Sequence, residues 1–155
     1  MPIPEFVADL RAMVGDHPLW LSGVTAVIRR DDEVLLVRRA DNGEWSPVTG
    51  IIDPSEEPAV CAAREAMEET GVEIRVDRLA SVDSATSVTY PNGDRASYLD
   101  VNFACTWLSG EAYVADDESV DVRWCPVTEL PDMSPVLRDR IDAALSGDVA
   151  ARFLT

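Results

Sequence analysis

The stretch AAREAMEETG, residues 62–71, gathers three glutamates close together and ends at a glycine. Gly71 suits the left-handed residue that commonly follows a helix C-terminus. Upstream, Pro58 suits the first turn of a helix, where its missing N–H costs nothing. We therefore predict a helix that begins near Pro58 and ends at Gly71.

The three glutamates share one face of this helix, at about 100° of rotation per residue. They are Glu65, Glu68 and Glu69. The opposite face, which is expected to pack on a sheet, carries Val60, Ala63 and Met67. The predicted helix is thus amphipathic, with a polar face of a single sign.

Two interpretations of this acidic face are open. One is a solvated surface, but like charges spaced i,i+3 and i,i+4 repel. The helix dipole also disfavours anions in the last turn, and only Arg64 is near enough to compensate. The other is a metal site, because clustered carboxylates are hard oxygen ligands that suit Mg²⁺ or Mn²⁺.

Residues upstream extend the pattern. Gly50 is followed after five residues by Glu56, and after seven more by the run REAMEETGV, residues 64–72. This resembles the signature of the Nudix (MutT-like) hydrolases: Gly, five residues, Glu, seven residues, Arg-Glu-aliphatic-any-Glu-Glu-any-Gly-aliphatic. The order of elements resembles that family from about Val24 to Leu145. The resemblance implies an α+β Nudix fold.

Three positions depart from the family's pattern. Ser55 stands where glycine usually precedes Glu56, and Val48-Thr49-Gly50 stands where Pro-Gly-Gly is usual. The aliphatic slot after Glu65 holds only Ala66. These departures bear on loop geometry and substrate fit more than on metal binding.

The resemblance also implies a reaction, in which water attacks phosphorus in a nucleoside diphosphate linked to another group. Mg²⁺, or Mn²⁺, would neutralise the pyrophosphate and lower the pKa of bound water. The implied metal ligands are the Gly50 carbonyl, Glu65, Glu68 and Glu69, with Glu56 in an outer position. Arg64 is implied to orient the glutamates, and it joins Glu65 and Glu68 as a catalytic candidate.

Three candidates lie outside the signature. Arg39 matches a position where some family members contact phosphate; a strand-end surface charge is the alternative. Trp45 is a candidate for stacking on a base, with a packing anchor as the alternative. Glu118 precedes a late strand, where several Nudix enzymes carry the general base, and a solvated acidic loop is the alternative.

Four further residues are interpreted as structural. Tyr90 and Asp94 flank a turn, and Cys61 is a small filler near the acidic face. His17, the only histidine, lies at a helix–strand junction. A His-based catalytic triad is therefore not expected.

The remaining pattern predicts a mixed, largely antiparallel sheet sandwiched by helices. Asn-Gly within YPNGD, residues 90–94, favours a tight hairpin. Residues 1–155 are expected to form a single domain with its core at about 20–146. The predicted elements are helices at about 3–15 and 134–147, strands at 23–30, 33–39, 72–90, 95–108 and 120–127, and a loop at 43–58.

The net charge is -16, from 29 acidic residues against 13 arginines and no lysine. Such a surface repels phosphodiester polymers, so DNA and long RNA are not expected as partners. A small nucleotide fits this charge if a metal mediates. No apolar run reaches the roughly 20 residues of a membrane helix, and the N-terminus does not resemble a signal peptide.

The three cysteines have no metal-type spacing and cannot all pair internally, which indicates a reducing, cytoplasmic setting. A homodimer is open, because the N-terminal helix can cover the sheet or a partner. Two other functions are open: a catalytically weak Nudix-fold nucleotide-binding module, and a prenyl diphosphate isomerase, for which the chain looks short. The candidate substrates are ADP-ribose, nucleoside triphosphates, dinucleoside polyphosphates and nucleotide sugars.

Overall fold

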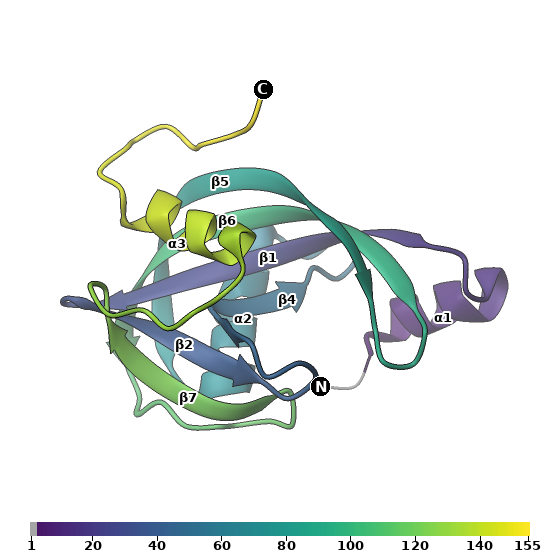
Figure 1. Ribbon diagram of the computed structural model, residues 1–155, viewed down its shortest axis with the longest axis horizontal. Helices are drawn as coiled ribbons and strands as arrows, with labels where there is room; N and C mark the ends of the chain where they lie inside the picture. Colours follow the sequence, from purple (N-terminus) through teal and green to yellow (C-terminus); the bar gives the residue numbers. More distant parts are fainter. Residues whose placement is uncertain (1–2) are drawn as a thin grey trace.

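The computed structural model of the chain describes residues 3–155, with the side chains of residues 85 and 86 left out. The described residues form three helices and one seven-stranded sheet (Figure 1). In chain order these are α1 (Glu5–Val14), β1 (Leu19–Arg30), β2 (Glu33–Arg39), β3 (Trp45–Ser46), β4 (Val48–Ile51), α2 (Pro58–Thr70), β5 (Glu73–Thr89), β6 (Arg95–Ser109), β7 (Ser119–Pro126) and α3 (Pro135–Leu145).

Strand β1 lies at the centre of the sheet. It runs parallel to β6 and antiparallel to β2 and β4, while β5 pairs antiparallel with β6 and β7 with β2. Gly23 of β1 therefore lies between Ile51 of β4 and Asp100 of β6. The prediction of a mixed, largely antiparallel sheet is confirmed.

Helices α2 and α3 cover opposite faces of the sheet. Successive strand residues point to opposite faces, so Val24 and Ala26 pack in the cluster that contains α2, and Val27 packs with α3. Helix α1 lies apart from both, beside the β5–β6 hairpin (Figure 1), where Val7 packs on Leu21. The predicted sandwich of sheet and helices is confirmed. No helix among residues 3–155 is long and apolar enough to span a membrane.

The prediction of a loop throughout residues 43–58 is wrong. Residues 45–46 pair with β2, and residues 48–51 pair with β1. In the sequence, Pro47 and Gly50 indicate interruptions of regular secondary structure. In the fold, Pro47 lies between the two short strands and Gly50 pairs with Val24. Tertiary pairing overrides the low strand propensity of glycine, and it places the Gly50 backbone beside the central strand.

Both predicted hairpins are present. Arg30 pairs with Glu33 across the first turn. In the second, the Tyr90 N–H donates to the Asp94 carbonyl at 2.8 Å, and Gly93 has a φ of 89°. That φ lies in the left-handed region that favours glycine. Tyr90 and Asp94 thus close the turn.

A buried ion cluster ties α3 to the sheet. The Arg140 guanidinium donates to both Asp83 oxygens, at 2.6 and 3.0 Å, and lies 3.1 Å from Asp100 Oδ2. Thr25 Oγ1 donates to Asp100 Oδ1 at 2.9 Å. Asp100 is only 4% exposed, and this burial raises its pKa to about 6 even though Arg140 opposes the shift.

Asp100→Asn is expected to flatten the pH dependence of stability. The folded pKa of about 6 lies above the ordinary value of about 3.9, so the stability contributed by protonated Asp100 is complete below that value and is lost as the pH rises through 6. The loss amounts to about 3 kcal/mol. Urea unfolding of both proteins at pH 4.5, 6 and 7.5 measures it as the difference curve. Parallel curves would contradict the assignment.

Candidate active site

Helix α2 begins and ends where the sequence predicts. Pro58 occupies its first turn, and Gly71 follows it with a φ of 69° and an N–H that donates to the Met67 carbonyl. A Cβ on Gly71 would collide with the ring of Tyr113. Glycine is thus required here both for its backbone conformation and for close packing.

The predicted burial of α2 is wrong. Val60 and Met67 are exposed, at 59% and 49%, and only Ala63 packs partly against the core. The buried face instead carries Cys61, Ala62, Glu65, Ala66, Glu69 and Thr70. The small alanines let the helix approach the sheet closely, and this carries two carboxylates inward. Glu68 points outward, with its side chain 42% exposed.

Glu65 lies against the backbone of Gly50. Its side chain occupies the space that a Cβ on Gly50 would fill, so only glycine allows this approach. Glu65 is 1% exposed, and burial raises the pKa of its carboxyl to about 7 although Arg64 opposes the shift. Glu65 Oε2 is buried and has no hydrogen-bond partner among the described residues.

Arg64 joins three glutamates. It donates to both oxygens of Glu56, at 2.8 and 2.9 Å, to Glu65 Oε1 at 2.9 Å and to Glu68 Oε2 at 3.1 Å. The hydrogen bond from Arg64 is the main cause that lowers the pKa of Glu56 to about 2. Arg64 therefore orients carboxylates on both sides of itself, and it holds Glu56 through two hydrogen bonds.

Glu69 is the second inward carboxylate. It is 3% exposed, and in the described part of the chain its Oε1 has no hydrogen-bond partner. Burial raises the pKa of Glu69 to about 9, with further contributions from the negative charges of Glu118, Glu65 and Asp116. These acidic groups lie within electrostatic range of one another.

The loop before β7 reaches this site through backbone hydrogen bonds. The Tyr113 and Ala115 N–H groups donate to the Thr70 and Glu69 carbonyls, both at 3.1 Å, and the Ala40 N–H donates to the Glu118 carbonyl at 2.7 Å. The first two bonds satisfy carbonyls that the end of a helix leaves unpaired. Glu118 is thereby held between the end of β2 and the end of α2.

Arg39, the last residue of β2, lies within electrostatic range of Glu118 and Glu69. Its guanidinium donates to both Asp41 oxygens, at 2.9 and 2.7 Å. The Asp41 hydrogen bond raises the pKa of Arg39, and the charges of Tyr90 and Glu118 add to the rise. Arg39 in turn opposes the raised pKa of Glu69.

Three other residues singled out in the sequence, Trp45, Cys61 and His17, each make contacts within the protein. The Trp45 ring packs beside the α3-side core, with the Arg123 guanidinium 4.8 Å from its centroid. Cys61 is buried below Arg64, and burial raises the pKa of its thiol. His17 is exposed between α1 and β1, where its carbonyl accepts a 2.7 Å hydrogen bond from Arg11. The three cysteines are free thiols.

Ser55, a departure from the family pattern, has a φ of 69°. This is the left-handed region that favours glycine, so serine is held there against its own preference. The turn before α2 thus keeps a glycine-like conformation without a glycine.

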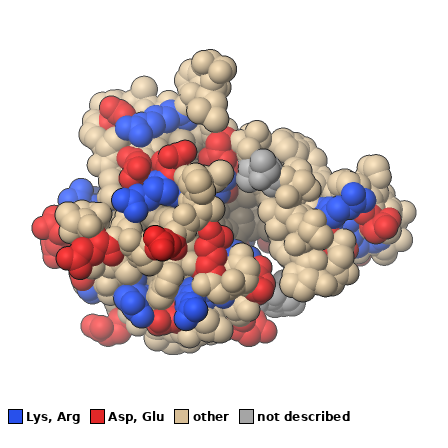
Figure 2. Space-filling model, viewed as in Figure 1, with Lys and Arg blue, Asp and Glu red and all other residues tan. Residues whose placement is uncertain are grey.

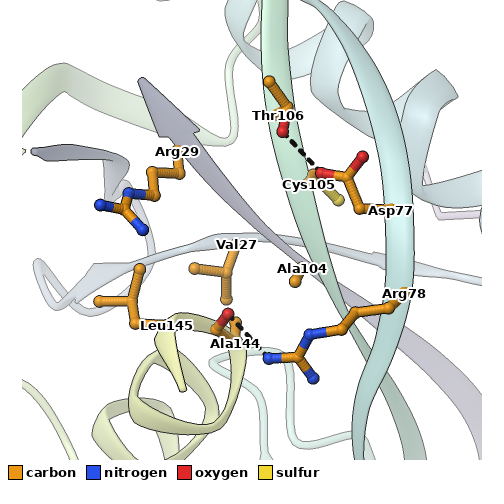
Figure 3. Close-up of a pocket in the computed structure, with 9 residues that line it drawn as sticks. All are labelled: Val27, Arg29, Asp77, Arg78, Ala104, Cys105, Thr106, Ala144 and Leu145. Atoms are coloured by element: carbon orange, nitrogen blue, oxygen red, sulfur yellow. Dashed lines mark hydrogen bonds between the residues drawn. The ribbon is translucent and has the colours of Figure 1, made fainter. Parts of the chain in front are cut away.

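Two cavities are lined by none of Glu65, Glu68 and Glu69. The one shown in Figure 3 opens at the end of α3 and contains none of the predicted site residues. There Arg78 donates to the carbonyls of Ala143, Ala144 and Ser146, at 2.9 to 3.1 Å, which stabilises the negative end of the helix dipole. The other, of about 480 Å³, reaches the site only at Glu56.

Sequence reasoning missed that Gly23, beside the β4 backbone, makes room for Tyr98 and Asp100. A Cβ on Gly23 would be 3.2 Å from Asp100 Oδ2, 3.4 Å from Tyr98 Cδ1 and 3.6 Å from the Gly50 carbonyl oxygen. The available signal was a glycine inside a β-branched run, which marks the close approach of other groups to a strand.

The residues fit a divalent cation in their chemistry. Two buried carboxylates, Glu65 and Glu69, each keep an unpaired oxygen, and one of them lies in the cradle formed by Gly50. Buried unpaired carboxylates are costly unless a cation joins them. Within residues 3–155 no group of three or more His, Cys, Asp or Glu side chains is already gathered as a complete ligand set.

Comparison with known proteins places the chain in a family. The NUDIX domain family model matches residues 20–144. A MutT-like protein from Streptomyces ambofaciens is 36% identical over 132 residues, which cover 84% of this chain and 79% of the relative. The NAD-capped RNA hydrolase NudC of Pseudomonas syringae pv. tomato is 29% identical over 133 residues, which cover 81% of this chain and 45% of that protein.

The fold agrees with this placement. The crystal structure of a MutT NUDIX hydrolase from Burkholderia pseudomallei matches with a TM-score of 0.61 and 25% identity, over 82% of this chain and 98% of that one. The predicted Nudix fold is therefore confirmed, and so is the resemblance drawn from residues 50–72. The chain belongs to the Nudix hydrolase family, whose members hydrolyse pyrophosphate bonds of nucleotides.

Proposed function

We propose that this protein is a Mg²⁺-dependent pyrophosphohydrolase that cleaves a nucleoside diphosphate linked to another group. The observation that carries the proposal is the inward pair Glu65 and Glu69, each buried with an unpaired oxygen and facing the Glu118 loop. A fold selected for stability alone would not bury two carboxyl groups that each keep an unpaired oxygen. The pair is therefore better explained by a ligand than by the architecture.

The proposed ligands are Glu65, Glu69, the more exposed Glu68 and the Gly50 carbonyl. When bound, Mg²⁺ or Mn²⁺ supplies charge neutralisation for the pyrophosphate and a lowered pKa for water. Arg64 holds Glu65 and Glu68 in position, and Glu56 fixes Arg64 from outside. Arg39, already oriented by Asp41, is the proposed phosphate contact.

The proposal covers several classes of nucleotide substrate. ADP-ribose, nucleoside triphosphates, dinucleoside polyphosphates and nucleotide sugars all contain the required bond. The NudC relative acts on NAD-capped RNA, so a capped RNA end belongs in the test set although the charge of -16 opposes a long polymer. Base stacking by Trp45, a homodimer and a cytoplasmic location stay predictions.

A substrate screen with and without metal tests the proposal. We expect phosphate or nucleotide release from at least one of these compounds in millimolar Mg²⁺ or Mn²⁺. Exhaustive EDTA treatment should abolish the release, and added Mg²⁺ should restore it. Full activity in EDTA would overturn the metal-dependent reading. Tight nucleotide binding without turnover would instead favour the binding-module function.

Glu118→Gln is expected to lower kcat by about 100-fold at neutral pH, because a general base contributes roughly that much. The acidic limb of the pH–rate profile should also change, while KM moves little. Glu111→Gln is the matched control, since Glu111 is an exposed glutamate of the same loop. If both variants keep the wild-type kcat and profile, Glu118 is not the base.

A further inference from the structure

Arg39 lies on the same face of the sheet as the two inward glutamates. In β2, Val37 packs in the core cluster that contains α2, and side chains two residues apart point to the same face of a strand. Arg39 pairs across the sheet with Ser119. The N–H of the next residue, Ala40, donates to the Glu118 carbonyl at 2.7 Å. The Arg39 side chain therefore begins beside the Glu118 loop, on the α2 side of the sheet.

The positive charge of Arg39 acts on this group of carboxylates. Glu69 Oε1 is buried and has no hydrogen-bond partner among the described residues, and Arg39 opposes the raised pKa of Glu69. The charge of Glu118 adds to the raised pKa of Arg39. Arginine pairs strongly with carboxylates, above all through two parallel hydrogen bonds. Arg39 nevertheless directs two of its hydrogen bonds to a different acid.

That acid is Asp41. Arg39 Nε donates to Asp41 Oδ1 at 2.9 Å, and Arg39 Nη2 donates to Asp41 Oδ2 at 2.7 Å. The guanidinium is planar, so this two-bond pair fixes its orientation and leaves the Nη1 donors for another partner. The two side chains are 32% and 33% exposed. The pair therefore lies at the edge of the protein interior, where a ligand from solvent can meet it.

The turn after β2 places Asp41 in this position. The Gly43 N–H donates to the Arg39 carbonyl at 3.0 Å, and the Arg39 N–H donates to the Glu44 carbonyl at 2.9 Å. Asn42 Oδ1 accepts a further 2.9 Å hydrogen bond from the Glu44 N–H. Gly43 has a φ of 73°, in the left-handed region that favours glycine. These features close the turn without the Asp41 carboxylate, which is left to hold Arg39.

The surroundings of Arg39 make such a restraint necessary. The chain has 29 acidic residues for 13 arginines, and arginines lie next to acidic side chains over the face drawn in Figure 2. An arginine released from its partner is thus expected to pair with another carboxylate nearby. For Arg39, Glu118 and Glu69 lie within electrostatic range. A salt bridge to Glu69 would occupy an oxygen that we assign to the metal.

We propose that Asp41 is a positioning residue, which keeps Arg39 away from the metal ligands and leaves its Nη1 donors for the pyrophosphate of the substrate. The inference rests on the proposed pyrophosphohydrolase function and adds the residue that separates the arginine from the carboxylates. Without Asp41, Arg39 competes with the cation for Glu69. Metal binding then weakens even when no substrate is present.

Asp41→Asn keeps the size of the side chain and removes its charge. We expect Mn²⁺, titrated calorimetrically into metal-free protein without nucleotide, to bind about 10-fold more weakly than to wild type, because residues that orient metal ligands contribute at least this much. The KM for the nucleotide found in the screen should also rise. Since Asp41 lies in a partly exposed turn, the melting temperature in EDTA should stay close to that of wild type.

Asp77→Asn is the matched control. Asp77 accepts a 2.6 Å hydrogen bond from Arg75, which is also two residues away, and its side chain is 32% exposed. It lines the cavity at the end of α3, which contains none of the predicted site residues. This variant should bind Mn²⁺ with wild-type affinity.

Removing Arg39 separates positioning from any other role of Asp41. In an Arg39→Met background no guanidinium competes for the ligands, so Asp41→Asn should leave the Mn²⁺ affinity unchanged. A loss of affinity in both backgrounds overturns the inference, because Asp41 would then act on the metal directly or through the turn. Equal affinity of wild type and Asp41→Asn rejects the positioning role alone. If wild type neither binds Mn²⁺ nor turns over any nucleotide, the proposed function itself is rejected.

Discussion

Glu69→Gln is expected to lower kcat by about 100-fold or more and, in metal-free protein, to raise the melting temperature. The loss of rate follows because a charged group that acts on the transition state is removed. The gain in stability follows because Glu69 is 3% exposed, has an unpaired oxygen and lies near Glu65, Glu118 and Asp116. Because the folded pKa of Glu69 is about 9, the wild-type protein must take up a proton at this carboxyl when it folds at pH 7.5, and glutamine removes that cost.

The measurement pairs steady-state kinetics in Mg²⁺ with thermal melts in EDTA at pH 7.5. Glu68→Gln is the informative comparison, because Glu68 is also a proposed ligand but its side chain is 42% exposed. It should lose activity in the same way with little change in melting temperature. If Glu69→Gln melts well below wild type in EDTA, Glu69 is a structural residue and its assignment as a ligand fails.

Gly50→Ala is expected to lower kcat by about 100-fold, in this case because of a steric collision. Its Cβ would collide with the Glu65 side chain, so Glu65 must leave its place against the β4 backbone. A misplaced group at a catalytic centre costs about 100-fold in rate. The buried site has little room for Glu65 to move, and the melting temperature should fall as well.

The matched control is Gly147→Ala, because a Cβ at Gly147 meets nothing within 4 Å. A double-mutant cycle identifies the cause. In a Glu65→Ala background the collision is absent, so Gly50→Ala should cost much less stability there than in wild type. Wild-type kcat in Gly50→Ala, or equal stability costs in both backgrounds, would show that Glu65 does not depend on this glycine.

The local pattern of the chain predicted much of the fold. The position of α2 followed from Pro58 and Gly71, and the second hairpin from its Asn-Gly turn. These features depend on residues within a dozen positions of one another, where helix periodicity and turn chemistry dominate. The spacing of the signature also identified the metal candidates before any contact was known.

The orientation of α2 could not be predicted in the same way. Amphipathic reasoning places charges outward and Val60 and Met67 inward, and the structure has the reverse for Glu65 and Glu69. Local amphipathic patterns fail where a protein uses buried polar groups, and this is the role that we propose for Glu65 and Glu69. Strand β4 was missed for a related reason: glycine at position 50 weakens a strand but makes room for Glu65.

The sequence by itself determined the family, the acidic helix and its ligand candidates, because these depend on spacing along the chain. Only the tertiary structure decided which groups meet there. The loop that carries Glu118 bonds to the end of α2, and the Glu65 side chain fills the space above Gly50. Arg140 meets Thr25 across 115 positions. Such contacts depend on the register of parallel β1 and β6 and on how closely small residues let elements approach, which no local periodicity encodes.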